Sequence, residues 1–332
     1  MSVAARLSIL AAAAAAGAPA LAHHGVAGVG AAGLKGPGAP VESASSSTLP
    51  KGSALAYLKL DYAKYRTFDD DPTVPESDYA QFWMAGVGYG FTPWFSAYAF
   101  APYHVKIDEP GGFNTRGWAD MSLFAQLGFK YDQGWKLIPA NESLDDLEDW
   151  HFTAYGGLTL PTGEPNLRED NGAIDPGKST GFGKPSWMVG ATTTKMFSDR
   201  WTLNAEVSYI GFQEYSYDDP DGLRAKFGAE TRLNGALIYR WLTDAERRTR
   251  WDLIIEGRYL HLGRDVTDGV PETATGGQMF YLEPGVRFYW DRLSLAFGVS
   301  RPVWTRLNEE DQQQGGEGTE RYRLVFTGSL LF

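Results

Sequence analysis

Apolar and polar side chains alternate along most of the chain beyond residue 52. The alternation occurs in runs of about ten residues or more, and turn-forming residues separate the runs. A period of two places successive side chains on opposite faces of a sheet, so each run predicts one β-strand. The predicted strands cover residues 53–65, 78–91, 94–107, 118–132, 150–161, 184–197, 200–213, 226–241, 250–262, 278–290, 292–305 and 322–332.

The connections between these strands are alternately short and long. The short connections include residues 92–93, 198–199 and 291, whereas residues 162–183 form one of the long loops. Bacterial outer-membrane barrels have short periplasmic turns and long external loops. The pattern therefore predicts an all-β fold, a transmembrane antiparallel up-and-down β-barrel of about 12 strands over residues 53–332.

One connection departs from this alternation. Residues 133–149 lie on the predicted periplasmic side but are long and rich in acidic side chains. We expect a short periplasmic helix or an extended turn there.

Five tryptophans flank the predicted periplasmic turns. Tryptophan favours the membrane–water interface, because its ring is apolar and one edge is polar. We therefore expect one aromatic girdle made by Trp94, Trp201, Trp241, Trp251 and Trp290. A soluble β-sandwich with an aromatic core is the alternative, but it would not explain the loop asymmetry together with the two chain ends.

Both ends of the chain carry features of an exported barrel. Residues 1–22 contain Arg6, a short apolar run and a small-x-small site at Ala20-Leu21-Ala22, which predict a signal peptide cleaved before His23. The apolar run is shorter than the roughly 18 residues that a membrane-spanning helix needs. The last predicted strand ends on Phe332, with aromatic residues and leucines at every second position. This ending resembles the signal recognised by the barrel-assembly machinery.

These features predict a protein of the outer membrane of Gram-negative bacteria. We expect its partners to be outer-membrane lipid and lipopolysaccharide, the barrel-assembly machinery acting on the strand that ends at Phe332, and a small-molecule solute. Without Arg6 the net charge is 30 − 1 − 41 = −12, which argues against binding of nucleic acid.

Residues 23–52 show no strand pattern and are rich in Gly, Ala, Ser and Pro. They form either a flexible periplasmic tail or a plug that enters the lumen. The mature chain would begin His23-His24-Gly25, and a free α-amine beside two imidazoles favours Cu(II) or Ni(II). The alternative is an incidental histidine pair, and we expect no other cofactor.

Charged residues share one face of the predicted strands between residues 200 and 290. A charge facing lipid at mid-membrane costs about 2–4 kcal/mol, so this face should line the lumen. The residues are Glu206, Glu230, Arg232, Glu256, Arg258, Glu283 and Arg287. They either pair across strands, as buried charges usually must, or line a polar path for a solute, and both can hold.

The opposite wall of the predicted lumen is aromatic and rich in glycine. Phe82, Tyr98, Phe100 and Tyr155 should face inward there. A charged wall opposite an aromatic wall suits an amphipathic or aromatic solute. About twelve strands lie between the eight that close around side chains and the 16–18 of open porins, so we expect a narrow lumen.

The residues for common enzyme chemistry are missing. The chain has no cysteine, which excludes disulfides and thiolate catalysis. Some twelve-stranded outer-membrane barrels are phospholipases that use a serine close to a histidine. No serine lies two positions from His104, His151 or His261, so we expect no enzymatic activity.

Three short motifs resemble a known family. They are the sequence Leu-Thr-Leu-Pro-Thr-Gly at 158–163, the loop at 175–183 and the hairpin Gly-Tyr-Gly-Phe-Thr-Pro-Trp at 88–94. Together with Phe332 they resemble the outer-membrane transporter-like family named for the meta-pathway of phenol degradation, over about residues 53–332. The resemblance implies a barrel that passes small hydrophobic or aromatic compounds, and it supplies no catalytic residues.

We therefore expect a channel or transporter for passive passage of a small aromatic or hydrophobic solute. Two other functions stay open. One is a copper-linked barrel that uses His23 and His24, and the other is a structural barrel with a plugged lumen.

Overall fold

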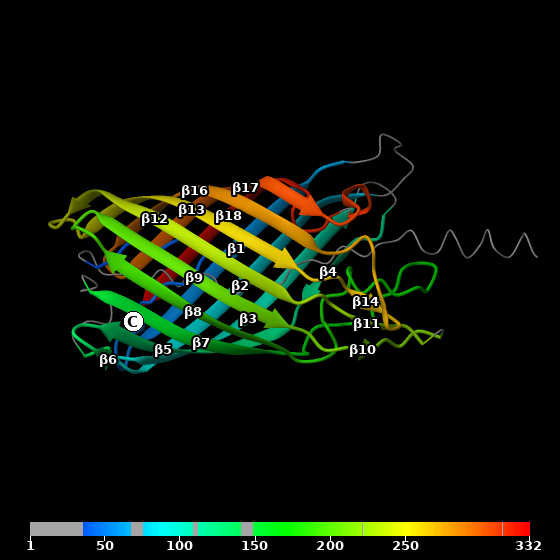
Figure 1. Ribbon diagram of the computed structural model, residues 1–332, viewed down its shortest axis with the longest axis horizontal. Coiled ribbons are helices and arrows are strands. Elements are labelled where there is room, and N and C mark those ends of the chain that lie inside the picture. Colours follow the sequence, from blue (N-terminus) through cyan, green and yellow to red (C-terminus); the bar gives the residue numbers. More distant parts are fainter. Residues whose placement is uncertain (1–35, 68–75, 109–111, 141–148, 221, 314) are drawn as a thin grey trace, which may run out of the picture.

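The computed structural model describes residues 36–67, 76–108, 112–140, 149–220, 222–313 and 315–332. In these residues, twelve antiparallel strands form a closed barrel, which confirms the predicted fold (Figure 1). The barrel strands are β1 (Ala54–Tyr65), β2 (Ser77–Thr92), β3 (Phe95–Asp108), β5 (Met121–Tyr131), β7 (Trp150–Leu160), β8 (Ser186–Met196), β9 (Trp201–Gly211), β12 (Glu230–Asp244), β13 (Thr249–Leu262), β16 (Gly277–Trp290), β17 (Leu293–Leu307) and β18 (Glu320–Leu331).

The barrel closes where its first and last strands meet. Strand β1 pairs with β2 on one side and with β18 on the other, from Leu55↔Leu331 to Tyr65↔Glu320. The C-terminus lies at the end of the barrel that carries the short turns (Figure 1). By the rule that short turns are periplasmic, this end faces the periplasm, and the opposite end carries the external loops.

The fourth predicted strand, 118–132, is interrupted in the structure. A short strand β4 (Thr115–Trp118) pairs with β3, and β5 begins only at Met121. Between them, the Asp120 carboxylate accepts the backbone N–H groups of Gly163 and Phe182, at 2.7 and 2.8 Å. The break therefore anchors the external loop that follows β7 to the barrel wall.

The connections contain short elements that the alternation did not predict. Four of them form a small sheet at the external end, with the order β10 (Tyr215–Ser216), β11 (Arg224–Lys226), β14 (Val266–Thr267) and β15 (Val270–Pro271). The predicted strand 226–241 accordingly starts later in the barrel, at Glu230. A 3₁₀ turn η1 (Glu310–Gln312) lies in the last external loop.

The fourth connection contains a short strand in its described part. Strand β6 (Trp135–Leu137) folds back on β5. This described part is extended, as in one of the two expected structures. Residues 141–148 lie outside the described residues.

The outer surface of the barrel is apolar where the alternation placed lipid. Trp201, Trp241, Trp251 and Trp290 are exposed near the periplasmic turns, and Trp94 is half-buried in one of them. These positions suit an aromatic girdle at the membrane interface. No helix in the described ranges is long and apolar enough to cross a membrane.

Candidate functional site in the barrel lumen

Residues 36–50, here called the lumen segment, lie inside the barrel. Nearly all of them are buried. At one end of the segment, the carbonyl of Gly36 accepts hydrogen bonds from Arg240 and Arg250, near the periplasmic ends of β12 and β13, at 2.6 and 2.7 Å. At the other end, Leu49 N–H donates to Ser96 at the start of β3, at 2.9 Å. The segment therefore enters from the periplasmic end, turns and returns to it.

The turn of the lumen segment reaches the middle of the barrel. There the Glu256 carboxylate on β13 accepts the backbone N–H groups of Val41, Glu42 and Ser43, at 3.0, 3.2 and 2.7 Å, and also the Ser43 hydroxyl. On β16, the Arg287 guanidinium donates to the carbonyls of residues 39 and 40. Buried backbone groups need such partners, because leaving them unpaired is costly.

Glu42 at the tip of the lumen segment forms two ion pairs with the barrel wall. Its carboxylate pairs with Lys59 on β1 and with Arg258 on β13, at 2.9 Å for the latter. Burial alone would raise the pKa of Glu42, but the positive charges of Lys59 and Arg258 outweigh burial and lower the pKa to about 2. Glu42 is therefore ionised at neutral pH and holds the tip between two strands.

The other side of the lumen segment packs on the aromatic wall. Ala44 and Leu49 belong to one buried cluster with aromatic side chains of five barrel strands. The aromatic members are Tyr57, Phe82, Tyr98, Phe100, Phe124 and Tyr155. The segment thus uses its backbone on the charged wall and its apolar side chains on the aromatic wall.

All the predicted lumen residues lie on the inner face of the barrel. Glu230, Glu256, Glu283, Arg287, Phe82, Tyr98, Phe100 and Tyr155 are buried. Glu206, Arg232 and Arg258 are half-buried and alternate with exposed outward residues such as Val207, Leu233 and Ile255. His23 and His24, the predicted metal ligands, lie outside the described residues.

The predicted charged residues form two groups, those that bind other side chains of the barrel wall and those that bind the lumen segment. Arg258 pairs with Glu283 on the neighbouring strand at 3.1 Å, and Arg232 pairs with Glu230 on its own strand at 2.6 Å. Glu206 accepts hydrogen bonds from Tyr155 and from Asn234, and from the backbone of Ala44. Glu256 and Arg287 bind the lumen segment instead of an opposite charge on the wall.

A second charged cluster was missed in the sequence. Arg323 on β18 contacts Asp61 on β1 at 3.2 Å and Glu317 in the last external loop at 2.9 Å. The period of two in strands 53–65 and 322–332 could have placed Asp61 and Arg323 inside. No periodic signal marks Glu317. Burial would raise the pKa of Glu317, but the charges of Arg323 and Arg232 lower it below its ordinary value.

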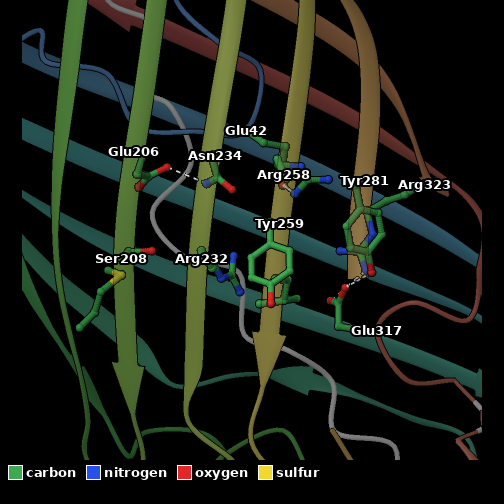
Figure 2. A pocket seen from close by; sticks show the side chains of 12 residues that line it. Glu42, Glu206, Ser208, Arg232, Asn234, Arg258, Tyr259, Tyr281, Glu317 and Arg323 are labelled. Carbon is green, nitrogen blue, oxygen red and sulfur yellow. Dashed lines mark hydrogen bonds and ion pairs between the residues drawn. The ribbon is translucent and has the colours of Figure 1, made fainter. Parts of the chain in front are cut away.

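Two small cavities that share lining residues lie above the lumen segment. One has a volume of about 30 Å³ and is lined by the tip residue Glu42 and by Arg232, Arg258 and Tyr281. Figure 2 shows that its side chains project from neighbouring strands into one space. The other has a volume of about 30 Å³ and lies beside Phe82 and His104. Arg323 and Glu317 line both cavities and lie between them.

An external loop covers the lumen from the opposite end. The Lys106 ammonium on β3 donates to the carbonyls of Gly177 and Ser179, at 2.6 and 2.8 Å, and Lys178 pairs with Asp108. Residues 178–182 are buried by these contacts. The cavities therefore form a chamber between the lumen segment below and the external loops above.

Several solved structures are similar in fold. An outer membrane channel from Pseudomonas putida F1 aligns over 88% of this chain and 100% of its own, with 14% identity and a TM-score of 0.64. The β domain of the Bordetella autotransporter BrkA aligns over 85% and 100%, with 9% identity and a TM-score of 0.45. A mutant of the TodX monoaromatic hydrocarbon channel aligns over 86% and 90%, with 12% identity and a TM-score of 0.38. At 14% identity the likeness to the Pseudomonas putida channel concerns the fold alone.

The sequence itself matches one family. A comparison with curated proteins finds no match. A family model described as "Putative MetA-pathway of phenol degradation" matches residues 68–310, which is more than half of the chain. This match agrees with the resemblance of the short motifs, and the chain belongs to that phenol-degradation MetA-pathway family.

Proposed function

We propose that this protein is an outer-membrane channel for a small aromatic solute, and that the lumen segment closes it at rest. The observation that supports this most is the chamber above the segment, which has an aromatic wall and a charged wall. The family match supports the same class of function. Passage is passive, because the outer membrane holds no ATP. We also propose that the protein has no enzymatic activity.

The charges of the chamber favour an uncharged solute. Arg258 is paired with Glu42 and Glu283, and Arg323 with Asp61 and Glu317. A charged solute would have to break such a pair, and an uncompensated buried charge is costly. A phenol-like molecule could instead stack on an aromatic ring such as Phe82 and exchange hydrogen bonds with Tyr281 or Glu317.

Opening requires the lumen segment to move. Both of its ends lie near the periplasmic rim, so the segment can leave toward the periplasm without passing through the chamber. Its contacts with the charged wall are hydrogen bonds and ion pairs, which water can replace once the segment is displaced. The closed state is therefore a docked state of the segment.

Single-channel conductance in planar bilayers tests this function. The full chain should give rare, short openings, and a variant lacking residues 36–50 should conduct persistently. Phenol should enter vesicles containing the deletion variant faster than benzoate does. Because the deletion could itself disturb folding, Glu256→Gln provides a second variant with the full-length chain, and its open probability should be higher than that of the wild type. Absence of conductance in the deletion variant and in Glu256→Gln would reject the channel.

A structural barrel with a permanently plugged lumen is the second candidate. The dense hydrogen bonding of residues 36–50 favours it. If the lumen is permanently plugged, neither the deletion variant nor Glu256→Gln should conduct, although both should insert into the membrane.

We also propose that residues 1–22 direct export and that the mature chain begins at His23. Mass spectrometry of the outer-membrane protein should find that terminus.

We further propose that His23 and His24 bind Cu(II) there, as a property separate from solute passage. Copper titration of the mature chain should give one tight site that His23→Ala removes. We also propose that the barrel-assembly machinery acts on the strand that ends at Phe332. The assembled barrel then contacts outer-membrane lipid and lipopolysaccharide.

A further inference from the structure

Strands β17 and β18 separate toward the external end of the barrel. Their pairing ends at Ser300↔Arg323. Beyond this pair, β17 continues along β16 as far as Leu307↔Gly277, whereas β18 continues along β1 as far as Glu320↔Tyr65. The two strands diverge and leave a wedge in the barrel wall, with one edge of β17 unpaired by β18.

The wedge forms a cleft on the outer side of the barrel. It has a volume of about 410 Å³ and is lined by residues 301–305 on β17 and by Arg66, Gly318, Glu320 and Arg321 on the other side. Residues 315–319 are buried and close the cleft toward the lumen. The cleft is therefore separate from the solute chamber and faces the membrane.

The cleft carries an excess of positive charge. Arg66 is already held by the carbonyls of Gly318 and Thr319 and by Glu310. Arg301 donates through Nε to the carbonyl of Arg321, at 3.1 Å. Both Arg301 and Arg321 are exposed, and no acidic partner of either is found within the described part of the chain. The acid of the cleft, Glu320, is paired with Arg323 at 2.5 Å.

Apolar residues flank these arginines on the membrane side. Val303 and Trp304 on β17 are 57% and 46% exposed, and Trp304 lies opposite Phe280 on β16. Exposed tryptophan at the end of a barrel strand marks the membrane–water interface. The cleft thus combines two guanidinium groups that have no acidic partner among the described residues with an apolar surface toward the external end of β17.

We propose that this cleft binds the phosphorylated headgroup of an external-leaflet glycolipid. Guanidinium groups bind phosphate through paired, charge-assisted hydrogen bonds, so Arg301 and Arg321 bind the phosphate. Val303 and Trp304 contact the upper part of an acyl chain. Basic pockets on membrane proteins recognise anionic lipid headgroups by this combination of charge and apolar contact.

Native mass spectrometry of the full-length barrel in detergent tests the site. The probes are bisphosphorylated lipid A and the same lipid without phosphates. The variant R301Q/R321Q should bind the bisphosphorylated lipid at least about tenfold more weakly, because each charge-assisted hydrogen bond is lost. The matched control R224Q/R247Q removes two exposed arginines away from the cleft and should bind like the wild type.

Further arms of the experiment separate the lipid from other sources of phosphate. Inorganic phosphate should compete poorly, because it supplies no acyl chain for Val303 and Trp304. Phosphatidylglycerol should compete less well than bisphosphorylated lipid A, because it offers one phosphate to the two arginines. Equal binding of the two lipid A forms would overturn the proposal, as would an unchanged affinity in R301Q/R321Q. Full competition by inorganic phosphate alone would assign the cleft to a free anion and would overturn the lipid as ligand. A brominated acyl chain should quench part of the tryptophan fluorescence on binding, and Trp304→Phe should reduce this quenching.

Discussion

Glu256 lies in the middle of the lumen and binds a stretch of backbone rather than an opposite charge on the wall. Its two carboxylate oxygens accept three consecutive N–H groups and one hydroxyl of the lumen segment. Carboxylate oxygens accept hydrogen bonds, and every one of these partners donates to Glu256. This one side chain therefore contributes strongly to the position of residues 41–43.

The substitution Glu256→Gln should loosen the lumen segment. The glutamine amide group would face N–H donors, so at least one buried donor would lose its acceptor, at a cost of about 2–3 kcal/mol. The chain has no cysteine, so Ser45→Cys provides a single probe at a buried position of the segment. Its reaction with a thiol reagent should become at least about tenfold faster in the Glu256→Gln background.

A matched control is Glu230→Gln, another buried carboxylate, which pairs with Arg232 on its own strand. It should leave the reactivity of Cys at position 45 close to that of the parent. Equal acceleration by both substitutions would mean that general loosening of the barrel, and not the contact of Glu256, controls the segment.

At the scale of elements, the small external sheet depends on a buried carboxyl group. Asp265 follows β13 and accepts the backbone N–H of Gly228, at 2.7 Å, so it links the loop before β12 to the loop that contains β14. Burial, with a smaller contribution from the negative charges of Glu272 and Glu230, outweighs the hydrogen bond from Gly228 and raises the pKa of Asp265 from 3.8 to about 7.

The stability of this loop contact should therefore fall as the pH rises from about 4 to 7. The folded loop retains the proton of Asp265 over this range, whereas the opened loop releases it, so each pH unit costs roughly 1.4 kcal/mol. Above pH 7 both forms are ionised and the dependence should level off. Hydrogen exchange at the Gly228 amide, corrected for the intrinsic exchange rate, measures this opening.

The substitution Asp265→Asn should abolish the slope, because the amide oxygen still accepts the hydrogen bond but does not titrate. Asp268→Asn, at an exposed acidic residue in the same sheet, should preserve the slope. A slope that survives in Asp265→Asn would assign the pH dependence to another group.

At the scale of the whole molecule, the barrel has two environments that meet at every strand. Ile255 points outward at the middle of β13 and is 41% exposed, whereas its neighbour Glu256 is fully buried in the lumen. On the outward face, a charge is costly where lipid surrounds it and much less costly near the two interfaces. The depth of a residue in the membrane should therefore decide the cost of a charge at that position.

Ile255→Arg should lower the free energy of unfolding by about 2–4 kcal/mol, because it places a charge at mid-membrane. Leu242→Arg, on an outward position near the periplasmic end of β12, should cost about 0–1 kcal/mol. Urea unfolding in lipid vesicles compares the two. Equal costs would contradict the proposed position of the membrane around the barrel.

The alternation of side chains by itself determined the barrel and the orientation of its wall. Successive residues of a strand face lipid and lumen in turn, so apolar and polar side chains alternate along the chain, as in Ile255 and Glu256. The sequence of a single strand therefore shows which side chains face lipid. For the same reason, every charged and aromatic residue expected in the lumen lies on the inner face. The resemblance of short motifs supplied the family.

Only the tertiary structure decided what fills and divides the lumen. Val41 and Glu256 lie far apart in sequence, and the lumen segment has no periodicity that would place it inside. The break before Asp120 and the wedge beyond Ser300↔Arg323 depend on where neighbouring strands stop pairing. Pairing depends on two strands and on the loops between them, so no single stretch of sequence contains it. The same holds for Glu317, which reaches Arg323 only because its loop folds inward.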